Sequence, residues 1–361
     1  MMKIRLAITA VILLSICGTL TAKETENNYM DNLKLTQAWD KKFPKSDKVN
    51  HRKVTFINRF GIELAADIYE PEGMSGKLSA LAVAGPFGAV KEQVSGRYAQ
   101  AMAERGFVTM AFDPSFTGES GGEPRNTASP DINTEDFSAA IDYLATLPEV
   151  DADRIGIIGI CGWGGMALNA TAIDTRIKGT VTSTMYNMSE QMHNGYQFAP
   201  VSAADLLKTK IAINAQRTAD ALAGKPEYVG GFPKERPVDV PQFMLDYWDF
   251  YMSPERGYID RAPACSTGWT KTTPLAFINT PLDTFIEDII TPVLLIHGEK
   301  AHSRYFSEEA FIRLKGDNKH LMIIPGANHT DLYDNLDVIP YDEIEQFFKS
   351  NMKSLASFKI C

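Results

Sequence analysis

The sequence alternates short apolar segments of strand length with segments of helical periodicity along most of its 361 residues. The largely apolar segments are residues 81–84, 107–112, 154–160, 178–183, 293–297 and 321–324. Between them, residues 98–105, 134–147 and 164–173 carry apolar side chains at helical spacing. Buried strands joined through helices form a mostly parallel sheet with helices on both faces. The sequence therefore predicts an α/β fold, preceded by a β-hairpin over residues 53–69.

Composition and charge exclude several classes of protein. Hydrophobic residues make up 44 % of the chain, which is enough for a sizeable core, and the net charge of −9 argues against nucleic acid or an anionic membrane as the main partner. The four cysteines are too few and too scattered for a disulfide framework or a zinc finger, and no nucleotide-binding fingerprint occurs. We therefore predict a small-molecule substrate and no cofactor or metal; the sequence leaves the oligomeric state open.

The first residues predict export. Lys3 and Arg5 precede an apolar run of about eleven residues, and small residues up to Ala22 offer a cleavage site, as in a secretory signal peptide over residues 1–22. The run is too short to span a membrane. Cys17 is a weaker candidate for lipid attachment, because the bulky Ile16 precedes it. We expect a periplasmic or extracellular protein.

The mature chain is expected to contain one core interrupted by an insertion. Residues 23–50 are polar and form a lead-in, residues 51–185 and 281–350 make up the α/β core, and residues 351–361 form a tail. Residues 186–280 break the strand–helix alternation and are rich in Met, Tyr, Phe and Trp. This composition predicts a helical cap whose aromatic side chains wall a pocket.

The strongest chemical signal is a turn between a buried strand and a helix, DRIGIIGICGWGG over residues 153–165. Glycines on both sides of Cys161 allow the tight turn and the close approach of strand and helix. The turn lifts Cys161 above the carboxyl edge of the sheet, at the positive end of the following helix. We expect the helix to lower the thiol pKa and the Gly162 amide to face a carbonyl oxygen under attack.

This turn resembles the nucleophile elbow of the α/β-hydrolase superfamily, and in particular the dienelactone hydrolase and X-Pro dipeptidyl-peptidase-like branch. The other segments that carry the resemblance are GPFGAVKEQ (85–93), FDPSFTGESGG (112–122), HGEKAHSRYFS (297–307) and PGANH (325–329). The resemblance covers residues 50–350 and implies a hydrolase with Cys161 as nucleophile. A second register would place Trp163, which cannot attack a carbonyl, at the nucleophile position.

The resemblance also implies the other members of the site. The superfamily order of nucleophile, acid and histidine makes His329 the expected base, with His302 a weaker candidate. At the usual acid position stands Ala301, so Glu299 is the first choice for the acid and Asp331 the alternative. The second oxyanion donor is expected from Phe87 or Gly88, because Pro86 has no N–H.

Three functions remain open at this stage. The first is an exported hydrolase that cleaves an ester, thioester or lactone through Cys161 and His329. The second is an inactive binding protein of the same fold, which Trp163 and Ala301 would favour. The third is a peptidase of the X-Pro dipeptidyl-peptidase type; amide cleavage demands a well-placed acid to protonate the leaving amine, and this chain lacks one at the usual position.

Overall fold

The computed structural model describes residues 33–352. The predicted signal peptide, Cys17 and the end of the C-terminal tail lie outside the described residues. Among the residues that are described, no helix combines the length and the apolar character needed to cross a bilayer.

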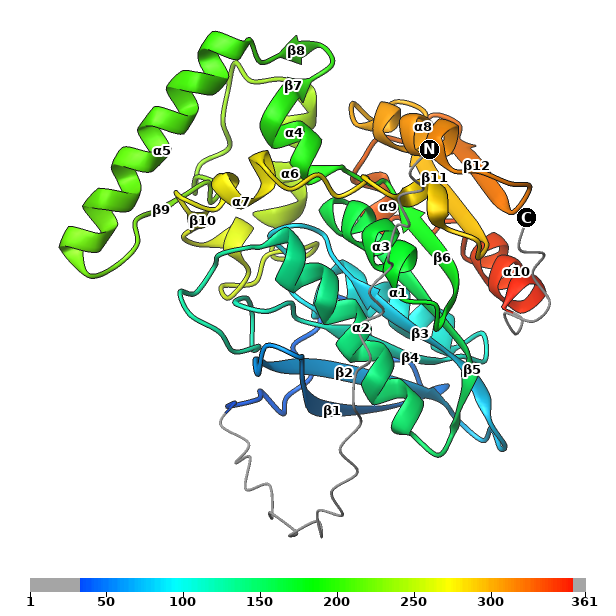
Figure 1. The fold of residues 1–361 in the computed structure, drawn as a ribbon. Coiled ribbons are helices and arrows are strands. Elements are labelled where there is room, and N and C mark those ends of the chain that lie inside the picture. Colours follow the sequence, from blue (N-terminus) through cyan, green and yellow to red (C-terminus); the bar gives the residue numbers. More distant parts are fainter. Residues whose placement is uncertain (1–32, 353–361) are drawn as a thin grey trace, which may run out of the picture. The chain divides into compact units, whose positions relative to one another are not determined.

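The core is an eight-stranded sheet in the order β1-β2-β4-β3-β5-β6-β11-β12 (Figure 1). The strands are β1 (Val49–Ile57), β2 (Glu63–Pro71), β3 (Leu78–Ala84), β4 (Val108–Phe112), β5 (Val150–Ile160), β6 (Ile177–Ser183), β11 (Val293–Gly298) and β12 (Lys319–Ile324). β1 and β2 form the predicted antiparallel hairpin, β2 pairs antiparallel with β4, and every pairing from β4 to β12 is parallel. The predicted mostly parallel α/β sheet is confirmed.

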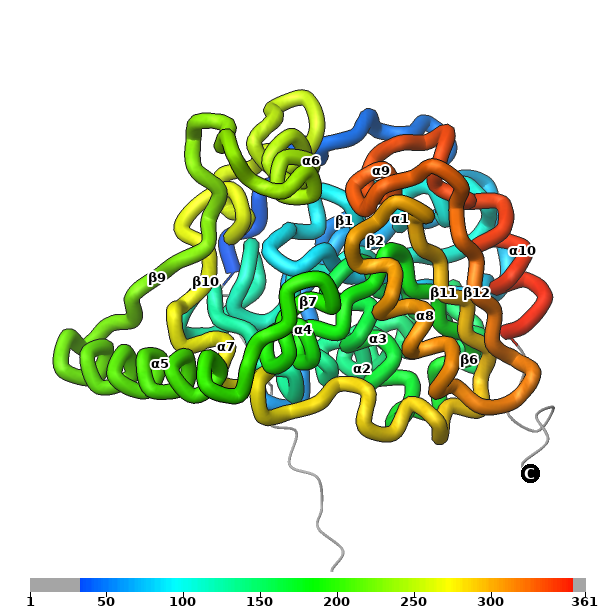
Figure 2. The backbone as a smooth tube through the Cα atoms, turned by 90° about the horizontal axis from the view of Figure 1, so that it is seen from above, coloured from blue at the N-terminus to red at the C-terminus, as the bar shows by residue number. Residues whose placement is uncertain are grey.

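Helices cover both faces of this sheet. α1 (Val94–Ala103) and α10 (Tyr341–Asn351) contact each other on one face. On the other face α2 (Pro130–Thr146) packs against α3 (Gly162–Ile173) and β5, and α8 (Arg304–Arg313) covers β11 and β12. Figure 2 shows these two layers on opposite sides of the strands. The central strands are buried on both faces, and for this reason their sequences are continuous apolar runs.

The segment between β6 and β11 adds small elements where the sequence predicts a cap. In chain order they are α4 (Met188–Asn194), β7 (Gly195–Tyr196), β8 (Ala199–Pro200), α5 (Ala203–Ala223), β9 (Tyr228–Val229), α6 (Gln242–Tyr251), the 3₁₀ turn η1 (Pro263–Cys265), β10 (Trp269–Thr270), α7 (Pro274–Ile278) and the 3₁₀ turn η2 (Ile286–Asp288). None of the α5 side chains is buried, whereas Phe250 and Tyr251 at the end of α6 pack into the core.

Candidate active site

Cys161 forms the tip of a tight turn between β5 and α3. Its backbone lies at φ 56° and ψ −126°, a conformation that non-glycine residues rarely adopt. The turn is held because the Cys161 amide donates to the Ser183 carbonyl and the Cys161 carbonyl accepts from the amides of Gly164 and Tyr186. A Cβ at position 162 would lie 2.7 Å from the Phe87 Cβ, so the neighbouring glycine lets the β3 loop approach. The structure thus places Cys161 at a strained strand-to-helix turn.

Trp163 points away from this turn into the core. Its ring packs edge-on against Phe112 and Phe137, with centroids 6.2 and 5.8 Å away. Trp163 is therefore a packing residue of α3 and does not lie at the tip of the turn. This removes one of the two features that favoured an inactive protein.

The Cys161 thiol is enclosed, and three hydrogen-bonding groups face it. The side chain of Cys161 is almost fully buried, and the residue is 6 % exposed. Burial raises the pKa of the thiol, and its hydrogen bonding with the Tyr333 hydroxyl and the backbone amides of Phe87 and Gly162 only partly opposes this rise. The expected lowering of the thiol pKa is therefore wrong, because desolvation of the thiolate outweighs the favourable dipoles.

Phe87 and Gly162 are the two predicted oxyanion donors that the structure brings to Cys161. Gly88 lies one residue further along the β3 loop, where its carbonyl accepts from the Ala264 amide. A pair of N–H groups converging on one thiol can stabilise negative charge on a carbonyl oxygen under attack.

His329 lies in the loop after β12 and is buried. Its Nε2 is 3.1 Å from the hydroxyl of Tyr333, the same hydroxyl that bonds the Cys161 thiol. Its Nδ1 is 2.7 Å from Ser303 Oγ and 2.9 Å from Thr184 Oγ1. Burial, together with the neighbouring His302 and His297, lowers the His329 pKa well below its usual value. The imidazole is therefore neutral and able to accept a proton.

A chain of uncharged groups continues behind His329. Ser303 Oγ also lies 3.0 Å from His297 Nε2, and His297 Nδ1 lies 2.7 Å from Ser307 Oγ. Burial lowers the His297 pKa to about 3, so this second imidazole is neutral as well. One proton arrangement satisfies the whole chain: His329 Nδ1 donates to Ser303, Ser303 donates to His297 Nε2, and His297 Nδ1 donates to Ser307.

The structure does not bring the expected acid to His329. Glu299 is exposed, and its carboxylate accepts from the Gly326 amide at 2.8 Å. Asp331, the alternative, accepts from the Asn328 amide at 2.8 Å. Ala301 is buried at the usual acid position, and the hydroxyls of Ser303 and Thr184 bond His329 Nδ1 where a carboxylate was expected. Glu299 bonds an amide of the loop after β12 and Asp331 bonds an amide of its own loop, and neither carboxylate hydrogen-bonds His329 among the described residues.

Aromatic side chains of the inserted segment lie against the site. The ring centroids of Tyr186 and Tyr247 lie 5.4 and 5.2 Å from that of His329. The Tyr247 hydroxyl donates to that of Tyr186 at 3.2 Å, and Tyr186 in turn bonds His302 Nε2. Burial lowers the His302 pKa to about 4, and Phe243 stacks on its ring at 4.0 Å. His302 thus belongs to the wall of the site.

Sequence reasoning missed Tyr333, Ser303 and Thr184. Tyr333 follows His329 by four residues, which is the spacing of helical neighbours and the one local signal for it. Thr184 and Ser303 follow β6 and β11 at the carboxyl edge of the sheet, but a hydroxyl at such a position is common and carries no distinct pattern.

A buried ionic cluster holds the β3 loop that carries Phe87. Lys91 Nζ lies 2.7 Å from Glu92, 2.9 Å from Asp113 and 2.6 Å from Glu119. These three carboxylates have metal-binding spacing, but the Lys91 ammonium already supplies their positive charge. Lys53 lies 2.7 Å from Glu119 and 3.4 Å from Glu92, and Arg261 of the inserted segment adds a further cation at 2.8 Å from Glu92.

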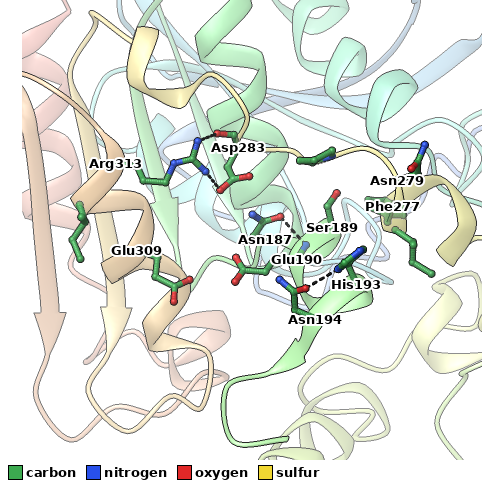
Figure 3. A pocket seen from close by; sticks show the side chains of 13 residues that line it. Asn187, Ser189, Glu190, His193, Asn194, Phe277, Asn279, Asp283, Glu309 and Arg313 are labelled. Atoms are coloured by element: carbon green, nitrogen blue, oxygen red, sulfur yellow. Dashed lines mark hydrogen bonds and ion pairs between the residues drawn. The ribbon is translucent and has the colours of Figure 1, made fainter. Parts of the chain in front are cut away.

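A separate pocket of about 700 Å³ lies between α4, α7 and α8 (Figure 3). Glu190 and Glu309 face each other in it, and Asp283 pairs with Arg313 of the same helix as Glu309. Burial and the neighbouring Glu309 and Asp283 raise the Glu190 pKa to about 7. Neither Cys161 nor His329 lines this pocket.

Fold and site together define an α/β-hydrolase. The structure superposes on the α/β-hydrolase GrgF from Penicillium sp. sh18 with a TM-score of 0.67 at 18 % identity, over 84 % of this chain and 99 % of that one, which shows a common fold. The model of the X-Pro dipeptidyl-peptidase (S15) family matches residues 61–331. The chain belongs to this family, and the resemblance predicted from the sequence is confirmed.

Two further relatives are informative. The uncharacterized protein PA2218 of Pseudomonas aeruginosa is 55 % identical over 341 residues, which cover 93 % of this chain and 91 % of that protein. Its crystal structure superposes with a TM-score of 0.86 over 88 % of this chain and 99 % of that one. The thiohydrolase aneE of Aspergillus aculeatus is 28 % identical over 184 residues, covering 51 % of this chain and 56 % of that protein. Family and fold support a hydrolase.

Proposed function

We propose that this hydrolase cleaves carboxylic esters or thioesters, lactones included, through Cys161 as nucleophile and His329 as base. The observation that carries the proposal is the convergence on one buried thiol of two backbone N–H groups and, through Tyr333, a neutral imidazole. A thiol at a strained turn, a base and an oxyanion site are the parts that acyl transfer needs. The relative aneE is named a thiohydrolase, and this name supports thioesters as substrates.

The reaction begins with attack of the Cys161 sulfur on the carbonyl carbon while its proton passes to His329. The oxygen takes up the electron pair beside the amides of Phe87 and Gly162. Collapse of this intermediate breaks the bond to the leaving alcohol or thiol, which receives the proton from His329. Water then hydrolyses the acyl-thioester, and the proton that it loses returns to the Cys161 sulfur.

The peptidase alternative rests on the family that the chain belongs to. Hydrolysis of an amide requires full protonation of a poor leaving group by an imidazolium. The imidazolium of His329 would have only hydroxyls at Nδ1 and a pKa lowered by burial. Because no carboxylate stabilises that cation, we expect activated esters and thioesters to be cleaved well ahead of X-Pro amides.

The test compares hydrolysis of p-nitrophenyl butyrate, a butyryl thioester and Gly-Pro-p-nitroanilide by the wild type, Cys161→Ala, Cys161→Ser and the matched control Cys265→Ala. Cys265 is also buried, and its thiol donates to the Tyr251 carbonyl away from Cys161. We expect ester and thioester turnover that vanishes in Cys161→Ala and persists in Cys265→Ala. Turnover that survives in Cys161→Ala would refute the nucleophile, and preference for the anilide would establish the peptidase.

The pH dependence of Cys161 alkylation gives a second readout. Because burial raises the thiol pKa, iodoacetamide should label Cys161 with a midpoint above the ordinary value of 9.0. Labelling is measured by mass spectrometry of the peptide that contains Cys161. A midpoint well below 9 would show a preformed thiolate and contradict the neutral site. A protein that hydrolyses none of the three substrates and resists alkylation at every pH would be a binding protein.

A further inference from the structure

The geometry around His329 separates the proposed base from the nucleophile by one hydroxyl group. Tyr333 lies on the short helix α9 (Asp331–Asp334) and is fully buried. Its hydroxyl bonds His329 Nε2 at 3.1 Å and also bonds the Cys161 thiol. The imidazole nitrogen that would deprotonate the nucleophile is thus occupied by Tyr333. Resting on the function proposed above, we infer that Tyr333 is a catalytic residue that carries the proton between Cys161 and His329.

A hydroxyl is suited to this position because it donates and accepts at the same atom. In the resting site the thiol donates to the Tyr333 oxygen while Tyr333 donates to the free lone pair of His329 Nε2. When the sulfur attacks a carbonyl, the thiol proton moves to the Tyr333 oxygen and the proton of Tyr333 moves to Nε2. The sulfur–carbon bond forms, the carbonyl oxygen takes the electron pair, and Tyr333 ends neutral. When the leaving group departs, His329 Nε2 returns its proton to the Tyr333 oxygen while Tyr333 passes its own proton to the departing oxygen or sulfur, so that both side chains end neutral.

Charge at the site makes the relay necessary. Burial raises the pKa of Cys161 and of Tyr333 and lowers that of His329, so all three are neutral near pH 7. Among the described residues, the groups that face this cluster are the hydroxyls of Thr184 and Ser303, the tyrosines Tyr186, Tyr247 and Tyr251, and the imidazoles of His297 and His302. No carboxylate hydrogen-bonds any of these three groups within the described part of the chain. A preformed ion pair is therefore disfavoured, and the proton has to move during attack.

The packing holds the Tyr333 ring independently of its hydroxyl. Phe250 lies edge-on to it with centroids 5.0 Å apart, and the His329 and Tyr251 rings lie 5.4 and 6.3 Å away. Tyr333→Phe therefore keeps the ring and removes the bridging oxygen. The matched control is Tyr341→Phe on α10, since Tyr341 is also buried and its hydroxyl has no hydrogen-bond partner.

The experiment measures the pre-steady-state acylation rate of the full chain with p-nitrophenyl butyrate from pH 6 to 10. We expect Tyr333→Phe to slow acylation about 100-fold at pH 7, in the range of general acid–base effects, with KM nearly unchanged. The deficit should shrink as pH approaches the thiol pKa, because a thiolate needs no proton acceptor. Tyr341→Phe should match the wild type at every pH. If loss of any buried tyrosine hydroxyl slowed acylation through packing, this control would be slowed as well.

A Tyr333→Phe variant with wild-type acylation at pH 7, or with a deficit that is the same at every pH, would overturn the relay. If Tyr333→Phe does not fold, incorporation of 3-fluorotyrosine at position 333 keeps the hydroxyl and lowers its pKa. The acylation–pH profile should then move to lower pH, and an unmoved profile would also overturn the relay. Activity that survives in Cys161→Ala would instead refute the proposed function itself, so the two failures are distinguishable.

Discussion

At the scale of single residues, the site is a set of neutral groups. A helix N-terminus stabilises a nearby anion by about 0.3–1 kcal/mol when exposed and up to about 2 kcal/mol when partly buried. Removing a charge from water costs several kcal/mol. Because Cys161 and His329 are both buried, the second effect dominates, and neither side chain is charged near pH 7. This balance explains why the helix at Gly162 does not produce a thiolate.

The hydroxyl of Ser303 takes over the orienting role of a carboxylate. Ser303→Ala removes its bond to His329 Nδ1 and leaves Thr184 as the remaining partner. We expect kcat/KM for p-nitrophenyl butyrate to fall about fivefold, the equivalent of one net hydrogen bond of about 1 kcal/mol, with the loss in kcat. Ser307→Ala, one bond further from His329, should lose less. An unchanged kcat in Ser303→Ala would show that Thr184 alone orients the imidazole.

At the scale of elements, the site lies where several chain segments end at one edge of the sheet. Cys161 follows β5, Thr184 follows β6, Ser303 lies beyond β11 and His329 beyond β12. Parallel strands place their carboxyl ends at the same edge, so residues far apart in sequence meet there. The inserted segment then closes the site with aromatic side chains, which explains the burial of Cys161.

The contact between α4 and α8 gives a pH-dependent prediction. The Glu190 pKa is raised to about 7, so the stability that its protonated form contributes is full below about pH 4.5 and is lost as pH rises through 7. At pH 8 the charged Glu190 faces Glu309 and Asp283, and Glu190→Gln removes this repulsion. Because Glu190 is half-exposed, we expect a gain of only about 1 kcal/mol at pH 8 and little difference at pH 5.

Thermal unfolding at both pH values checks the Glu190 prediction, with the exposed Glu104→Gln on the C-terminal cap of α1 as the control. An equal Tm for the wild type and Glu190→Gln at pH 8 would contradict it.

At the scale of the whole molecule, the buried ionic cluster joins three parts of the chain. Lys91 and Glu92 belong to the β3 loop, Asp113 and Glu119 follow β4, and Arg261 belongs to the inserted segment. Each ion alone would be costly to bury, so the cluster is stable only when its cations and anions are all in place. The loop that presents Phe87 is therefore positioned by contacts that span the molecule.

Lys91→Met removes the cation that Glu92, Asp113 and Glu119 share, and it leaves the buried Asp113 without an ion-pair partner among the described residues. We expect a loss of about 3–5 kcal/mol in the free energy of unfolding, because uncompensated buried charge is strongly unfavourable. Lys208→Met, which breaks an exposed pair with Asp205 on α5, should change the free energy of unfolding far less, because solvent screens exposed pairs. Urea denaturation followed by tryptophan fluorescence measures both. Equal midpoints for the two variants would show that the cluster contributes nothing to stability.

The sequence alone determined the alternating elements, the hairpin, the turn at Cys161 and the place of His329, because each depends on local periodicity, on glycine spacing or on chain order. Only the tertiary structure decided the direction of the Cys161 pKa shift, the replacement of a carboxylate by Ser303 and Thr184, and the position of Tyr333 between thiol and imidazole. The burial of a side chain and its hydrogen-bond partners depend on segments that are distant in sequence. A local pattern around Cys161 therefore specifies where the proposed nucleophile lies, while its proton chemistry depends on residues that only folding brings to it.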